Sequence, residues 1–225
     1  MFHRFATAAV VVLSFAAAHT LPSAAQQPAP AKQASVKLDI DDVREMFNAG
    51  KSDEAYPKLN RLSRNGNVEA KYLLSTMYAE GKGVPGRKAD AAKSLTLLRQ
   101  AATMNYARTP GKWGFAKAQY ELAQRYFAGK GVSKSEAQGV KWLTNAAQQG
   151  YDKALIELPA HFTGAKGVKK DPQQGYFWAG VGVKNLSGAE QDAARKLLAE
   201  YRAMLSDRRV AQLNAKVVDW EPRKD

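Results

Sequence analysis

One short pattern recurs three times in the chain, and it constrains the fold more than any other feature. Its copies read "YAEGKGV" at residues 78–84, "YFAGKGV" at residues 126–132 and "FTGAKGV" at residues 162–168. Before each copy, apolar residues recur every four positions, as one stripe of an α-helix requires. These stripes are Ala70, Leu74 and Tyr78; Ala118, Leu122 and Tyr126; and Ala154, Leu158 and Phe162. Such a recurrence is typical of stacked structural repeats.

A second helix is expected after each glycine pattern. Asp90, Ser135 and Asp171 are residue types that favour the N-cap position. Seven positions after these caps stand the large residues Leu97, Trp142 and Trp178. In the first two copies an alanine pair follows, so large and small residues alternate as an interdigitating helix–helix seam requires. The sequence therefore predicts an all-α solenoid of antiparallel helix pairs, with about three core repeats.

The glycines have two alternative interpretations, a phosphate cradle or a structural turn. A phosphate-binding loop follows a buried strand and reads G-x-x-x-x-G-K-[ST]. Gly81 and Gly86 have the glycine spacing, but "RK" follows them and a helical pattern precedes them. No nucleotide or other cofactor is therefore expected. The glycines are expected instead to end a helix and reverse the chain, at Gly81, Gly83, Gly129, Gly131 and Gly167.

The third copy departs from the first two. Ala165 stands where the first glycine is expected and Gly164 precedes it, so the turn should be shifted by one residue. Pro159 lies inside the preceding helix and should kink or shorten it, because proline lacks a backbone donor.

The N-terminus reads as a targeting segment. An apolar run at residues 5–18 follows Arg4, and Ser23 and Ala25 are small residues in the A-x-A pattern of a cleavage site. We expect residues 1–25 to be a signal peptide cleaved after Ala25; the alternative is an uncleaved N-terminal anchor. Residues 26–36 are rich in Pro, Ala and Gln and should form a flexible linker.

Residues 37–222 are then expected to form the helical repeat domain. Its repeats are placed at about 67–106, 115–150 and 151–186, after a degenerate leading helix pair in residues 39–66. Closing helices are expected in residues 187–220, and Ser187 with Glu190 should form a capping box.

Charge and cysteine content narrow the classes of partner and chemistry. The chain has a formal net charge of +13 and no cysteine. Disulfides, thiolate metal sites and a cysteine nucleophile are thereby excluded. For an exported protein, periplasmic or secreted, an acidic protein partner, an anionic envelope polymer or lipid head groups are expected rather than nucleic acid. No apolar segment after the signal is long enough to span a bilayer.

The repeat residues resemble the Sel-one-like repeat (SLR) family, a branch of the tetratricopeptide (TPR) superfamily. "AQYELAQRYFAGKGV" and "VKWLTNAAQQG", between Ala118 and Gly150, match its pattern nearly throughout. "GYFWAGVGVKNL" and "SDRRVAQLNAKVVDWEP" resemble the last repeat and closing helix of bacterial members. The resemblance implies a right-handed superhelix of helix pairs that binds other proteins, and it implies no reaction.

Two surfaces are candidates for partner binding. The first is a groove on the first-helix faces. Tyr72 lies about 200° around the helix from Leu74 and so should not share the core stripe. The groove candidates are Tyr72, Thr76, Tyr120, Gln124, Phe127 and Ile156. The alternative is that these residues pack against the adjacent repeat.

The second candidate surface is a basic edge formed by the glycine loops, which fall on one side of a solenoid. Its residues are Lys82, Arg87, Lys88, Lys130, Lys134, Lys166, Lys169 and Lys170. The alternative is that these exposed cations only aid solubility.

No catalytic or metal-ligating residue is predicted. His161 is the only histidine after residue 25, and no serine has the spacing of a known nucleophile motif. The favoured function is an exported, non-catalytic protein–protein interaction scaffold of the bacterial cell envelope. The alternative is a cell-wall-associated enzyme or accessory subunit, a glycan or peptide hydrolase or a β-lactamase-like protein.

Overall fold

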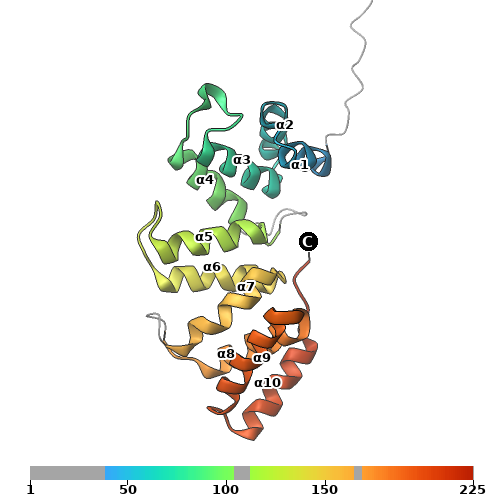
Figure 1. Ribbon diagram of the computed structural model, residues 1–225, viewed down its shortest axis with the longest axis vertical. Helices are drawn as coiled ribbons and strands as arrows, with labels where there is room; N and C mark the ends of the chain where they lie inside the picture. The colour runs from blue at the N-terminus through green and yellow to red at the C-terminus, as the bar shows by residue number, and fades with distance from the viewer. Residues whose placement is uncertain (1–38, 104–111, 165–168, 225) are drawn as a thin grey trace, which may run out of the picture. The chain divides into compact units, whose positions relative to one another are not determined.

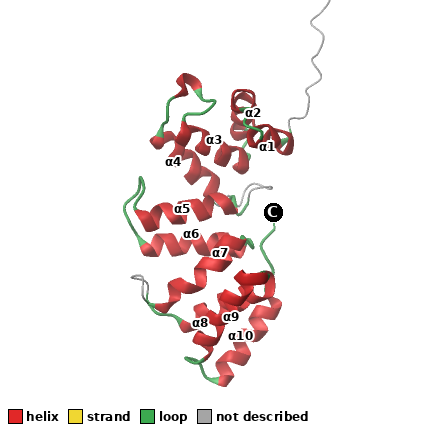
Figure 2. Ribbon diagram, in the orientation of Figure 1, coloured by secondary structure: helices red, strands yellow, loops and turns green. Residues whose placement is uncertain are grey.

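The computed structural model describes residues 39–103, 112–164 and 169–224. The chain divides into two units, residues 1–36 and 37–225, and every described element belongs to the second. The described residues are helices and loops, with no strand among them (Figures 1 and 2). The α-helices are α1 (Ile40–Asn48), α2 (Ser52–Arg64), α3 (Val68–Glu80), α4 (Ala91–Ala102), α5 (Ala116–Ala128), α6 (Glu136–Gln148), α7 (Asp152–Glu157), α8 (Pro172–Asn185), α9 (Gly188–Arg202) and α10 (Asp207–Asp219). Two short 3-10 helices are η1 (Pro85–Arg87) and η2 (Leu158–Thr163).

Consecutive helices pack as pairs. Helix α3 packs mainly against α4, α5 against α6, and α8 against α9. Contacts of α2 with α3, α4 with α5 and α6 with α7 join one pair to the next (Figure 1). Elements that contact mainly their neighbours in sequence are the mark of an α-solenoid. The predicted fold class is therefore confirmed, and α1 and α2 form the predicted leading pair.

The same backbone hydrogen bond closes all three glycine loops. In each, the N-cap residue of the second helix donates its N–H to the carbonyl of the aromatic residue near the end of the first. The donor and acceptor residues are Asp90 and Tyr78 at 2.8 Å, Ser135 and Tyr126 at 3.0 Å, and Asp171 and Phe162 at 3.0 Å. The cap side chains also accept from the first turn of their own helices, so the predicted N-caps are confirmed.

The glycines that end the first helices adopt the conformation expected of them. Gly81 and Gly129 are the C-caps of α3 and α5, each with φ of 72°. A Cβ atom on Gly81 would lie 2.7 Å from the backbone nitrogen of Ala89 in the same loop. Positive φ also occurs at Gly83 and Gly131. These four glycines are therefore required by the turn itself.

The third repeat is irregular in the predicted way. Helix α7 ends at Glu157 and the chain continues as η2, which contains Pro159. Gly164 then takes the C-cap position with φ of 89°, so the one-residue shift of the turn is confirmed. Gly167 lies outside the described residues.

Two apolar clusters fill the space between the helices. One extends from α1 to α5 and includes the fully buried Leu98 and Leu122. The other extends from α5 to α10 and includes Leu155. Trp142 packs against both clusters. Trp142 therefore connects the two clusters, so that apolar contacts continue from α1 to α10.

Two helical glycines let aromatic rings lie directly on the backbone. A Cβ atom on Gly139 would lie 2.1 Å from the Phe127 ring, and one on Gly175 would lie 2.2 Å from the Tyr201 ring. The Tyr201 hydroxyl then donates to the carbonyl of Pro159 at 2.6 Å. Helix α9 is thereby tied to the irregular third repeat.

The closing helices lie where the sequence predicts them, but their first cap differs. Ser187 makes no side-chain hydrogen bond to the start of α9, so the predicted capping box is wrong. The next residue, Gly188, has φ of 58°, which is outside the right-handed helical range. We attribute the lost cap to this turn, which changes the direction in which the chain enters the helix.

Candidate protein-binding surfaces

Tyr72 lies between repeats rather than in an open groove. Its side chain is only 8% exposed, its ring centroid is 5.3 Å from that of Phe115, and Lys117 Nζ lies 5.4 Å from the ring centroid. Tyr72 belongs to the first apolar cluster, and its contacts with Phe115 and Lys117 at the start of the next repeat are those of the alternative that the sequence left open. Burial raises the pKa of the Tyr72 hydroxyl to about 12. Thr76 donates to the Tyr72 carbonyl at 3.3 Å.

The equivalent face of the second repeat holds a carboxylate of the third. Tyr120 Oη and Gln124 Nε2 both donate to Glu157, the latter to Oε2 at 2.7 Å. The Tyr120 ring lies 5.3 Å from that of Tyr151. Burial, and then the hydrogen bond to Glu157, raises the pKa of the Tyr120 hydroxyl well above its ordinary value. Tyr120, Gln124 and Glu157 form a clamp that joins α5 to α7.

Phe127 and Ile156, the remaining residues of the predicted groove, also lie in contacts between repeats. Phe127 stacks on His161, with ring centroids 4.5 Å apart. His161 is 4% exposed, and its Nδ1 lies 3.8 Å from Glu136 Oε2 at the start of α6. Ile156 is half-buried against the second apolar cluster. Packing between repeats, the alternative that the sequence left open, accounts for these contacts. Partner binding at this face stays a prediction.

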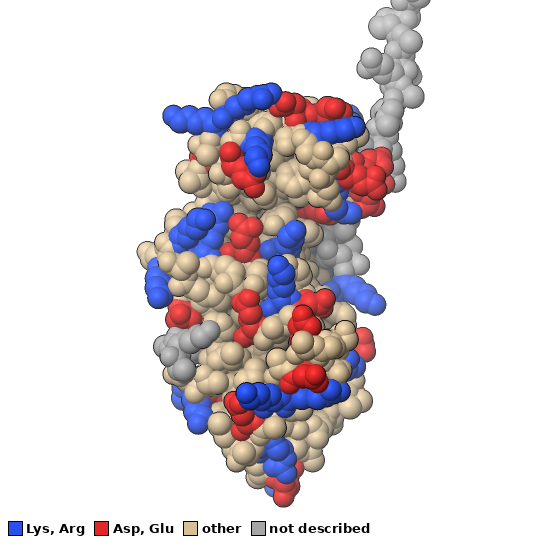
Figure 3. Space-filling view, in the orientation of Figure 1, with Lys and Arg blue, Asp and Glu red and all other residues tan. Residues whose placement is uncertain are grey.

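The described residues of the three glycine loops lie along one edge of the helical unit (Figure 1). Lys and Arg side chains are present along the same margin, with acidic ones between them (Figure 3). Lys82 pairs with Glu80 at 2.9 Å and Arg87 with Asp53 at 2.6 Å. Lys166 lies outside the described residues. The remaining predicted residues are exposed and form no ion pair with any described residue: Lys88, Lys130, Lys134, Lys169 and Lys170.

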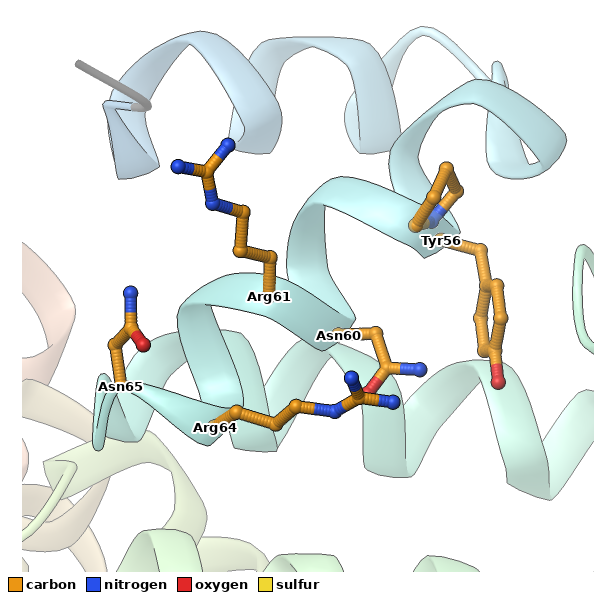
Figure 4. Close-up of a pocket in the computed structure, with 6 residues that line it drawn as sticks. Tyr56, Asn60, Arg61, Arg64 and Asn65 are labelled. Atoms are coloured by element: carbon orange, nitrogen blue, oxygen red, sulfur yellow. The ribbon is translucent and has the colours of Figure 1, made fainter. Parts of the chain in front are cut away.

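A further site surrounds Tyr56 on α2, and no pattern in the sequence predicts it. Two hollows of about 330 and 520 Å³ are both lined by this residue, and we call them together the Tyr56 site. The first is lined by Tyr56, Pro57, Asn60, Arg61, Arg64 and Asn65. The second is lined by Tyr56, Tyr78, Pro85, Lys88, Ala89, Asp90, Ala91 and Lys93. In the first hollow Arg64 extends toward Asn60, whereas Arg61 points the other way (Figure 4).

Two tyrosines join the hollows of the Tyr56 site. The hydroxyl oxygens of Tyr56 and Tyr78 are 2.9 Å apart, and their rings meet edge to face. Lys93 Nζ lies 4.2 Å from the Tyr78 ring centroid. Burial, with the hydrogen bond to Tyr78, raises the pKa of Tyr56 to about 12, so the hydroxyl is neutral at physiological pH. Nothing in the sequence signals this pair, because Tyr56 belongs to a leading helix without the repeat pattern.

Within the described ranges, no group of three or more His, Asp and Glu side chains is arranged to hold a metal ion. None of the described helices combines the length and apolar character needed to cross a bilayer.

Comparison with known proteins identifies the repeats. The family model of the Sel1 repeat matches residues 68–106, 116–151 and 160–180. The first two segments contain α3 with α4 and α5 with α6, whereas the third begins within η2 and ends within α8. The leading pair α1 and α2 lies before the first matched segment, and α9 and α10 lie after the last.

Two curated relatives are similar over part of their length. Each is an exopolysaccharide production negative regulator, one from Rhizobium meliloti (strain 1021) and one from Rhizobium leguminosarum bv. viciae. Both are 22% identical over 143 aligned positions, which cover 47% of this chain and 53% or 54% of the relative. The chain thus spans about half the length of the curated relatives it matches.

Solved structures of repeat proteins are also similar. A Sel1 repeat protein from Oxalobacter formigenes is 23% identical, with a TM-score of 0.47, over 71% of this chain and 97% of that one. The protective antigen c5321 of uropathogenic Escherichia coli, which displays an SLR fold, is 20% identical with a TM-score of 0.41. That match covers 74% of this chain and 41% of the antigen.

Proposed function

The chain is a member of the Sel1 repeat family, and from that premise we propose that it is an exported, non-catalytic adaptor that binds a protein partner in the bacterial cell envelope. Sel1 repeats suggest protein–protein interaction. The observation that carries the proposal is the triple repetition of one loop geometry, which stacks helix pairs and sets their loops along one edge. Export rests on the signal pattern of residues 1–25, which lie outside the described residues.

The basic edge is the surface we assign to that partner within this proposal. Its five cations without an ion pair among the described residues attract an acidic surface through long-range charge interaction. Replacing Lys130, Lys134 and Lys170 by Glu should weaken a salt-sensitive interaction by about tenfold or more, since each lost contact is replaced by a repulsive one. Unchanged binding would reject the basic edge while leaving the adaptor function open.

The position of His161 supports the non-catalytic part of the proposal. A general base must come within hydrogen-bonding reach of a substrate. His161 is almost fully buried against the ring of Phe127 and the carboxylate of Glu136. Assaying the purified chain against cell-wall fragments and β-lactams tests this directly. Turnover that is lost on replacing His161 would favour the enzyme alternative instead.

In-cell crosslinking followed by identification of the adducts tests the adaptor function. We expect recovery of one envelope protein together with the chain. Recovery of none, with the chain retained in the cytoplasm, would overturn the proposal.

We extend the same proposal to a role in exopolysaccharide production, and the names of the two curated relatives are its support. Since both are negative regulators, deleting the gene for this chain should raise exopolysaccharide output. Equal output from the deletion strain and its parent would remove this role and leave the interaction function untouched.

A further inference from the structure

The Tyr56 site combines two kinds of surface on adjacent elements. The first hollow is lined mainly by carbon atoms, including those of Tyr56 and Pro57, and Arg61 and Arg64 are also in its lining. The second hollow is mainly polar and carries Lys88 and Lys93. A ligand that fills both must therefore present an apolar group to the first hollow and a polar, anionic group to the second.

The cations of the site are available to a ligand. None of Arg64, Lys88 and Lys93 forms an ion pair with another described residue. Lys93 is held over the Tyr78 ring, which places its ammonium group without using its hydrogen-bond donors. The one acid in the lining, Asp90, already accepts the N–H of Lys93 as the N-cap of α4. The balance of the site is therefore positive.

The hydroxyl groups of Tyr56 and Tyr78 add one neutral hydrogen-bond donor to the cations of the site. Tyr56 and Tyr78 together carry two O–H groups, and their mutual hydrogen bond uses one. Among the described residues, none accepts a hydrogen bond from the second O–H. A hydroxyl O–H beside Arg and Lys groups is the arrangement that carboxylates accept from, because charge-assisted bonds are the strong ones.

We infer that the Tyr56 site binds an acidic segment of a partner protein in which an apolar side chain stands beside one or more carboxylates. This inference rests on the proposed function, since the ligand is part of a protein. The apolar hollow favours a peptide over an acidic polysaccharide, which would leave the Tyr56 and Pro57 surfaces uncovered. Neither hollow lies within the predicted groove, and only Lys88 is shared with the basic edge.

Selection from a random peptide library displayed on phage, with the purified chain as bait, tests the inference. We expect enrichment of peptides in which Asp or Glu flanks an apolar residue. Binding of a selected synthetic peptide, followed by fluorescence anisotropy, should fall about tenfold or more in the double variant Arg64→Gln/Lys93→Gln, because each group contributes a charge-assisted hydrogen bond. Tyr78→Phe should weaken it by a smaller factor.

The matched control removes two charges elsewhere. Lys196 and Arg208 are exposed on α9 and α10, and Lys196→Gln/Arg208→Gln should leave binding within about twofold, as screening at physiological salt predicts for remote charges. Circular dichroism melts of each variant show whether the fold is kept. Enriched peptides without acidic residues, or equal loss of binding in the control, would overturn the inference.

An acidic polysaccharide is the competing ligand, and polygalacturonate is its probe. If polygalacturonate binds with the same dependence on Arg64 and Lys93 while no peptide is enriched, the peptide assignment is wrong. If in-cell crosslinking recovers a partner but the site variants bind it normally, the Tyr56 assignment fails and the adaptor function stands. If crosslinking recovers no partner, the proposed function itself fails.

Discussion

At the scale of single residues, the side chains that define the repeats are used mostly to join one repeat to the next. Tyr72, Tyr120 and Phe127 occupy related faces, and each contacts the following repeat. Glu157 supplies both acceptors of the α5–α7 clamp. Partly buried polar contacts of this kind stabilise the folded chain mainly because removing one partner leaves the other without a hydrogen bond, which costs free energy.

Replacing Glu157 by Ala should destabilise the chain by about 1–3 kcal/mol, because two donors on α5 lose their acceptor. Urea unfolding measures the change. The control is Glu45→Ala, an exposed residue of α1, which should change the free energy of unfolding by no more than about 0.5 kcal/mol. Equal effects of the two substitutions would show that the clamp contributes nothing.

The raised pKa of Tyr201 leads us to expect that the folded chain loses stability at high pH. Its folded-state pKa is raised from 10.0 to about 12 by burial, so the neutral hydroxyl is favoured in the folded chain. The resulting stabilisation is complete below pH 10 and is lost as the pH rises toward 12. Tyr201→Phe should lower stability at neutral pH by about 1–2 kcal/mol, since the Pro159 carbonyl loses its donor.

The same variant should have a shallower fall in stability between pH 10 and 12 than the parent. Urea unfolding at neutral pH and at two values in that window measures the difference. Parallel curves for parent and variant would contradict the assignment, because Tyr56 and Tyr72 titrate in both proteins.

At the scale of the helical elements, turns and caps decide where each helix begins and ends. These features are local, and the sequence therefore predicted the N-caps, the C-cap glycines and the shortened third helix correctly. The Glu157 clamp and the Tyr56–Tyr78 pair were missed, because each depends on residues brought together from different helices. Ser187 was misjudged for a local reason, the positive φ of Gly188.

Substitutions at Gly81 and Gly50 distinguish two costs of adding a Cβ atom, namely backbone strain and steric overlap. Both have positive φ, but a Cβ on Gly81 would meet the backbone at 2.7 Å, whereas one on Gly50 would meet nothing within 4 Å. Gly50→Ala should cost about 1 kcal/mol from strain alone. Gly81→Ala should cost about 1–3 kcal/mol more, because the loop must shift. Thermal or urea unfolding compares them, and equal costs would contradict the tight loop.

Gly139 and Phe127 should behave as a coupled pair. Gly139→Ala should destabilise by about 1–3 kcal/mol, because its Cβ would overlap the Phe127 ring. In a Phe127→Ala background the same change should be neutral or stabilising, as the higher helix propensity of alanine predicts. A double-mutant cycle measures the coupling. Additive effects would show that the ring does not lie on α6.

At the scale of the helical unit, the segment after α10 links distant parts of the chain. The Arg223 N–H donates to the Gln148 carbonyl at 2.8 Å, and Trp113 Nε1 donates to the Lys224 carbonyl at 3.2 Å. The Arg223 guanidinium lies 4.6 Å from the Trp113 ring centroid. Arg223 and Lys224 thus contact residues far away in the sequence, whereas the described helices mostly contact their neighbours.

Ending the chain after Trp220 should remove that link. Hydrogen exchange at Trp113 and at the turn of residues 149–151 should become faster, while exchange in α3 should not change, because local opening reports local contacts. Hydrogen exchange measured by mass spectrometry resolves the two regions. Faster exchange throughout the unit would show instead that the segment supports the whole stack.

The central claim is that this helical stack binds a protein partner in the cell envelope, and site-specific photo-crosslinking in living cells tests it most directly. A photoreactive residue is placed at Ser133 beside the basic edge, at Ala91 in the Tyr56 site, and at Ala199 on α9 as the control; all three positions are exposed. We predict a single protein adduct from Ser133 or Ala91 and none from Ala199. Adducts from none of the three positions, or the same adducts from all of them, would contradict the claim.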